Sequence, residues 1–260
     1  MKNIVKSIGF ILLYFAVNFA AQVIISIPAA AKDPDGLNLW MNNNMLLISA
    51  ISNVVTVIVF AVIFKLRKTS IKEEWKLNKI SIKNAVLPLV TAFTFSSAFS
   101  LLTYNMSFNN MNMISASVDY YASVWKPLGI IMMAFSVLVM APISEEVLCR
   151  GIIFTRIEKS FSPVTALVLS SIFFGLMHIS AGGVVLSVGA IFMASVFGLI
   201  FLKTKSLPLS ILAHTAANLP DFIMFSHPEL NDTFRISAAI VLFTVSAACI
   251  VIMCRKKYEV

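Results

Sequence analysis

Residues 128–150 read LGIIMMAFSVLVMAPISEEVLCR, an apolar run that carries two adjacent glutamates near its end. A helix needs about 20 apolar residues to span the hydrocarbon core of a bilayer, and this run is long enough. Ionisable groups inside a span are costly and usually functional. The stretch therefore predicts a transmembrane helix that carries part of a functional site.

The composition of the whole chain is that of a membrane protein. Of the 260 residues, 59% are hydrophobic and 12% are charged, and the mean hydropathy is +0.90. A soluble domain is about 45–50% apolar and about 25% charged. This difference excludes a soluble globular protein, a disordered chain and a disulfide scaffold. The three cysteines have no metal-ligand spacing, which indicates packing residues.

We expect one integral membrane domain over residues 1–260, an all-α polytopic bundle of about eight transmembrane helices, with a catalytic core over 128–226. The predicted spans are 7–29, 45–64, 85–104, 128–149 (continuing as helix to about 157), 165–180, 185–202, 206–226 and 236–254. Only Ser180-Ala181-Gly182-Gly183 separates the fifth span from the sixth. The first span resembles a secretory signal, but it is longer than a usual signal, which predicts a retained anchor.

The positions of the basic residues predict the orientation. With the N-terminus in the cytoplasm, only Lys32, Lys126 and Arg235 of the 20 Lys and Arg residues fall outside. This is the positive-inside bias, and it predicts that both termini are cytoplasmic. The net charge of +8 is then a topology signal and gives no support to nucleic-acid binding. The basic segment 65–83 is either a solvated loop or a helix lying on anionic lipid.

Three groups of polar or ionisable residues lie inside predicted spans of the second half. They are Glu145, Glu146 and Arg150 in the fourth span, His178 in the fifth, and His214 and Asn218 in the seventh. Residues four apart share a helix face, which pairs Glu146 with Arg150 and His214 with Asn218, whereas Glu145 points about 100° away from Glu146. The helical rise gives the three groups similar depths, so we expect one site. The remaining histidine, His227, falls in a predicted loop.

This set of side chains is suited to hydrolysis. A buried carboxylate can take a proton from water near neutral pH, while histidine and asparagine can donate to a developing oxyanion. Glu145, His178 and His214 are also the ligand types of a hydrolytic zinc site with an open position for water. The sequence leaves metal-bound and carboxylate-activated water open, and both interpretations predict hydrolysis.

The motifs and their order resemble those of the CPBP family. The motifs are Glu145-Glu146-x-x-x-Arg150, Phe174-x-x-x-His178 and His214-x-x-x-Asn218. This family comprises the CAAX proteases and bacteriocin-processing enzymes, also called Abi or type II CAAX prenyl endopeptidase-like proteins. The resemblance implies an intramembrane endopeptidase, commonly labelled a metalloprotease, whose active site opens towards the cytoplasm.

The resemblance also implies roles for individual residues. Glu145 is expected to be the base, with Glu146 beside it. His178 and His214 are expected to bind water or a divalent metal such as Zn²⁺, and Asn218 to support the oxyanion. The remaining motif residues, Arg150 and Phe174, are expected to orient and pack the others.

The short loops and the composition suggest a protein of the bacterial cell membrane. Maturation of a peptide pheromone or bacteriocin, or bacteriocin self-immunity, is then favoured over the trimming of prenylated proteins seen in the eukaryotic branch. The expected partners are membrane lipid and a peptide or membrane-associated protein substrate, and the oligomeric state is open. Two alternatives are a non-catalytic immunity or binding protein and a proton-coupled transporter that uses Glu145, Glu146 and His178. No symmetric pair of broken helices supports transport.

Overall fold

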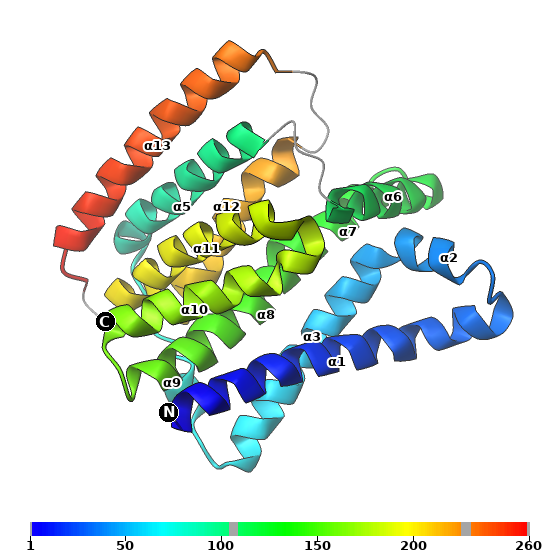
Figure 1. Ribbon diagram of the computed structural model, residues 1–260, viewed down its shortest axis with the longest axis horizontal. Coiled ribbons are helices and arrows are strands. Elements are labelled where there is room, and N and C mark those ends of the chain that lie inside the picture. Colours follow the sequence, from blue (N-terminus) through cyan, green and yellow to red (C-terminus); the bar gives the residue numbers. More distant parts are fainter. Residues whose placement is uncertain (1, 104–108, 225–229, 259–260) are drawn as a thin grey trace.

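The computed structural model is an all-α bundle, and it describes residues 2–103, 109–224 and 230–258 (Figure 1). Within these ranges, six helices are long and apolar enough to cross a membrane. They are α1 (Lys2–Lys32), α3 (Met45–Leu66), α5 (Ile82–Thr103), the continuous helix from α7 to α9 (Leu128–Glu158), α11 (Ile179–Thr204) and α13 (Asp232–Arg255). The prediction of a polytopic helical membrane protein is confirmed at this level.

Two further helices coincide with the fifth and seventh predicted spans. The helix α10 (Pro163–Met177) is apolar but has only 15 residues, and α12 (Leu207–Met224) is interrupted by polar side chains. His178 caps the C-terminal end of α10, and His214 lies on α12. The predicted break between the fifth and sixth spans is present, because α10 ends at Met177 and Gly183 adopts a φ of 65° inside α11.

Three shorter helices lie between the predicted spans, and only the segment 65–83, which contains one of them, had a surface helix among its predicted alternatives. They are α2 (Leu37–Asn43), α4 (Ile71–Glu74) and α6 (Asn109–Val124). The helix α6 mixes Asn and Ser with apolar residues, so it lacks the hydropathy that reveals a span. His227 lies outside the described residues.

The long helix that carries the glutamates is not a regular α-helix. It consists of α7 (Leu128–Met133), the π-helix η1 (Ala134–Met140), α8 (Ala141–Glu146), the π-helix η2 (Val147–Phe154) and α9 (Thr155–Glu158). π-helical turns are rare and occur frequently at functional sites. Here they flank the turn that holds Glu145 and Glu146 on both sides.

The basic helix ends gather at one end of the molecule, which we call the basic end. The start of α1 contacts the segment after α9, because Asn3 Nδ2 donates to Ser160 Oγ over 2.7 Å. Lys159 pairs with Glu74 at 3.1 Å, and Lys203 Nζ donates to the Cys254 carbonyl near the end of α13. Both termini lie on this side (Figure 1).

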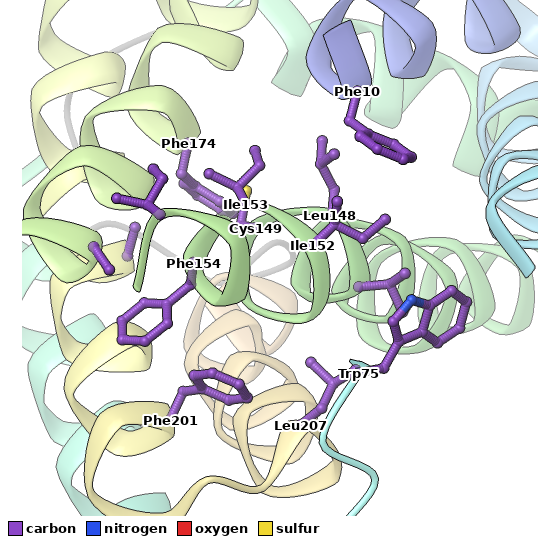
Figure 2. Close-up of a cluster of buried hydrophobic side chains, with 14 of the residues drawn as sticks. Phe10, Trp75, Leu148, Cys149, Ile152, Ile153, Phe154, Phe174, Phe201 and Leu207 are labelled. Carbon is purple, nitrogen blue, oxygen red and sulfur yellow. The ribbon is translucent and has the colours of Figure 1, made fainter. Parts of the chain in front are cut away.

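A tightly packed apolar core occupies the space between the basic end and the glutamates. Figure 2 shows that the helix η2 supplies the centre of this core, with aromatic and aliphatic side chains from neighbouring segments around it. Fully buried members are Leu148, Cys149, Ile152, Ile153, Phe154, Ile157, Phe201 and Leu207. Complete burial of these side chains excludes water from this side of the glutamates.

Candidate active site

Glu146 is fully buried and all of its described contacts are to neighbouring side chains. Its Oε2 lies 3.2 Å from Arg150 Nε and accepts a 2.6 Å hydrogen bond from Ser210 Oγ. Its Oε1 lies 3.1 Å from His214 Nδ1. The Arg150 side chain is also fully buried, so this is the intrahelical ion pair that the spacing of four predicts. With its partners arranged in this way, Glu146 holds the side chains of Arg150, Ser210 and His214 in place and is not accessible to solvent.

The hydrogen bonds of the two histidines define which ring nitrogen carries the proton. The Glu146 carboxylate accepts from His214 Nδ1, and the Phe174 carbonyl, 2.8 Å away, accepts from His178 Nδ1. Because both partners are acceptors, each Nδ1 carries a hydrogen. In a neutral ring, Nε2 then presents a lone pair, as in histidines that are oriented by a carboxylate or a backbone carbonyl.

Both Nε2 atoms face the same oxygen of Glu145. His178 Nε2 lies 3.9 Å and His214 Nε2 3.8 Å from Glu145 Oε2. The Glu145 side chain is 15% exposed, whereas that of Glu146 is 0% exposed. These separations are too long for direct hydrogen bonds, and such a gap between polar groups is the kind that a water molecule bridges. The convergence of the three side chains places them at one depth, as the helical rise predicted.

Aromatic rings fix the orientation of both histidines. The Phe174 ring stacks on His178 with a centroid distance of 4.6 Å, and the Phe197 ring stacks on His214 at 4.5 Å. The Arg150 guanidinium lies over both phenylalanines, at 5.4 and 5.8 Å from the ring centroids. One buried cation therefore contacts the acid and both aromatic supports of the site.

Pro142 creates the attachment point for α12. A proline has no N–H, so it cannot donate to Leu138 O four residues earlier or to Val137 O five residues earlier. Both carbonyls instead accept from α12, over 2.8 Å from Thr215 Oγ1 and over 2.9 Å from Asn218 Nδ2. One N–H of the Asn218 amide is therefore used for helix docking, and the second is left for another partner.

The donor types fit a zinc site, but the donor separations do not. Tetrahedral Zn²⁺ with bonds of about 2.0–2.1 Å places its ligands roughly 3.3–3.4 Å apart, whereas the two histidine Nε2 atoms lie 3.8 and 3.9 Å from Glu145 Oε2. Among the residues that the structure describes, no group of three or more His, Cys, Asp or Glu side chains is arranged to hold a metal ion.

A cavity of about 300 Å³ extends from the site away from the basic end. Its wall includes Glu145, His178, His214 and Asn218. Much of the remaining wall comes from the start of α3, the first half of α11 and the end of α12, the parts of these helices farthest from the basic end. The wall is predominantly apolar, with residues such as Phe99, Leu186, Met193 and Phe222. The cavity and the packed core thus lie on opposite sides of the glutamates.

Sequence reasoning missed two residues that position the site and one that docks α12. Ser210 and Phe197 hold Glu146 and His214, and Thr215 docks α12 beside Asn218. Thr215 and Ser210 do lie on α12 within four residues of His214, which is a weak signal in the sequence. Phe197 is one apolar residue among many in α11 and carries no signal at all.

Comparison with known proteins gives one family and one relative. Residues 127–220 match the family described as type II CAAX prenyl endopeptidase Rce1-like, a range that includes every motif residue. A protein of Mycoplasma capricolum subsp. capricolum, named only "Uncharacterized protein", is 28% identical over 156 residues. The match covers 56% of this chain and 45% of the relative, so it spans less than half the length of that protein. No solved structure matches this chain significantly.

Proposed function

We propose a function from the premise that residues 127–220 form an Rce1-like type II CAAX prenyl endopeptidase domain, whose family consists of membrane proteases. The chain is an intramembrane endopeptidase that hydrolyses a peptide bond with a water molecule held by Glu145 and His178, while His214 faces the oxyanion. One observation supports this assignment above the others. The Nε2 atoms of both histidines converge on Glu145 at the wall of a cavity, while Glu146 is sequestered behind them.

The proposed reaction uses each group for one task. His178 Nε2 accepts a hydrogen bond from the water, and Glu145 takes a proton from it as the oxygen attacks the peptide carbonyl carbon. The Glu146 carboxylate stabilises a protonated His214, whose Nε2–H donates to the oxyanion together with the second N–H of Asn218. The tetrahedral intermediate then breaks its C–N bond, and Glu145 returns the proton to the leaving amine.

The role of Asn218 is tested against its neighbour Thr215. Asn218→Ala is expected to lower kcat by about 10²–10³-fold, the effect of removing one oxyanion donor. Thr215→Val also removes a bond from α12 to η1, but Thr215 is not part of the cavity wall, so kcat should stay close to wild type. The measurement is hydrolysis of a fluorogenic peptide by detergent-purified protein, with melting temperature as the control for folding. Equal losses of kcat in both variants would show that Asn218 only docks the helix.

We further propose that the physiological substrate is a peptide or membrane-associated protein in a bacterial cell membrane. The six candidate spans and the Mycoplasma relative support this location. Maturation of a small peptide or bacteriocin self-immunity fits a protease whose cavity of about 300 Å³ accepts a short extended segment.

We propose a topology of eight spans with both termini in the cytoplasm. It is supported by the gathering of basic helix ends at one end of the molecule, where α10 and α12 also begin. In this orientation the cavity opens towards the outer side of the membrane, because it lies beyond the glutamates from the basic end. This differs from the cytoplasmic opening that the family resemblance implies.

Labelling of single cysteines tests the topology. In a variant without the three native cysteines, Asp35→Cys should react with a membrane-impermeant maleimide in intact cells. Lys79→Cys should react only after permeabilisation, because it lies in the connection at the basic end. Met45→Cys, at the cavity wall, should behave like Asp35→Cys. If Asp35→Cys and Lys79→Cys report the same side, the eight-span arrangement is wrong, and if Met45→Cys follows Lys79→Cys, the cavity opens to the cytoplasm.

A further inference from the structure

The cavity contains a second carboxylate that the proposed reaction does not use. Asp221 lies on α12, seven residues after His214 and three after Asn218, and its side chain forms part of the same cavity wall. Seven residues of helix correspond to about 10 Å. Asp221 is therefore two helical turns beyond His214, on the side away from the basic end. An ionisable acid inside a predominantly apolar span is costly, and such residues are usually functional.

The contacts of Asp221 leave most of its hydrogen-bonding capacity unused. Its Oδ1 accepts from Ser100 Oγ on α5, and no Lys, Arg or His side chain in the described ranges lies within ion-pair distance of it. Glu146, in contrast, has an arginine, a serine and a histidine around its two oxygens. Asp221 lines the cavity, and its Oδ2 accepts no hydrogen bond from a described residue, so this oxygen is available to a molecule in the cavity.

We propose that Asp221 is a specificity-determining residue that binds a cationic group of the substrate, either the ammonium of a lysine or N-terminus or the guanidinium of an arginine. This inference rests on the proposed function, because it places the peptide in the same cavity as Glu145. A carboxylate in an apolar surrounding, held by a single hydroxyl, attracts a cation more strongly than a solvated surface acid does.

The rise of α12 from His214 to Asp221 sets the expected position of the cation in the peptide. An extended chain rises about 3.3 Å per residue, so about 10 Å corresponds to about three residues. A long side chain such as lysine reaches one position farther or nearer. We therefore expect the preferred cation two to four residues from the scissile bond, on one side of it, with apolar residues between them that contact the cavity wall.

The test measures binding separately from hydrolysis. A set of fluorescently labelled peptides carries one lysine, norleucine or glutamate at each position near a central apolar pair, and binding to full-length Glu145→Gln protein is followed by anisotropy. Lysine at the preferred position should bind roughly 10- to 100-fold more tightly than norleucine, the range of a hydrogen bond to a charged group. Adding Asp221→Asn should abolish this preference, and Asp221→Lys should reverse it in favour of glutamate. Asp35→Asn, which removes a charge from an exposed loop, is the matched control and should change nothing.

Hydrolysis of the same peptides separates the two proposals. If Glu145-dependent cleavage occurs but lysine and norleucine peptides bind and react equally, the proposal that Asp221 binds a cation is wrong. The proposal that the protein is a protease is then supported. If the lysine preference depends on Asp221 but no peptide is cleaved, Asp221 binds a cation as proposed. The assignment of the protein as a protease is then contradicted. A fall in melting temperature of Asp221→Asn with an unchanged charge preference would show that the Ser100–Asp221 contact only joins α5 to α12.

Discussion

Glu145→Gln is expected to reduce peptide hydrolysis by about 10²–10⁴-fold, the contribution of a general base, and to leave the protein folded. The glutamine keeps the size and shape of the side chain but cannot take a proton from water. Glu145 makes no hydrogen bond shorter than 3.5 Å to a described residue, so the substitution breaks no structural contact. The measurement is kcat/KM on a fluorogenic peptide together with melting temperature in detergent. Wild-type activity in Glu145→Gln would remove the proposed site.

Two controls define what the loss in Glu145→Gln means. Glu73→Gln, on the exposed helix α4, removes the same charge outside the cavity and should leave activity unchanged. The chelator 1,10-phenanthroline should inhibit no more than its non-chelating 1,7-isomer, because the donor separations exceed those of a zinc site. Selective inhibition by the chelator would assign water activation to a metal held by Glu145, His178 and His214.

A Glu145→Gln variant that still protects cells from a bacteriocin would favour the alternative in which the protein confers immunity by binding, without catalysis.

Periodicity in the sequence was sufficient to assign different faces to the two glutamates. Because Glu146 and Arg150 are four residues apart, the pattern predicted their pairing and the divergence of Glu145. The ion pair and the partly exposed Glu145 side chain agree with it. Similar depths predicted that the histidines would meet the acid. These features depend only on helical geometry and on the cost of polar groups in a membrane.

Other features of the site depend on how helices pack, which the sequence does not reveal. Thr215 and Asn218 can bond the carbonyls that Pro142 leaves free only if α12 lies against η1. No residue pattern in either segment predicts that these two helices pack together. The cavity faces away from the basic end because η2 fills the other side with apolar residues, and each of those residues alone is indistinguishable from a lipid-facing one. The π-helical turns around α8 likewise have no signature beyond the proline.

The buried pair of Glu146 and Arg150 leads to the second large effect. Arg150 is the largest fully buried side chain of the described residues, and it contacts Glu146, Phe174, Phe197 and the Ala194 carbonyl. Arg150→Met leaves the Glu146 charge buried without its countercharge. Glu146→Gln likewise leaves the Arg150 charge buried without a countercharge. Removing one partner of a buried pair costs about 3–5 kcal/mol. The loss should appear as a lower free energy of unfolding in mixed micelles, whereas Lys159→Gln at the exposed pair with Glu74 should cost under about 1 kcal/mol.

The double variant separates folding from catalysis at this pair. Glu146→Gln combined with Arg150→Met removes both buried charges, so it should be more stable than either single variant. Its glutamine can still accept from His214 Nδ1 through the side-chain carbonyl, which keeps the imidazole in place, but it no longer stabilises a proton on that ring. We therefore expect stability to recover while kcat stays low. If activity returns together with stability, Glu146 and Arg150 act only as a structural pair, and the oxyanion must be stabilised without a protonated His214.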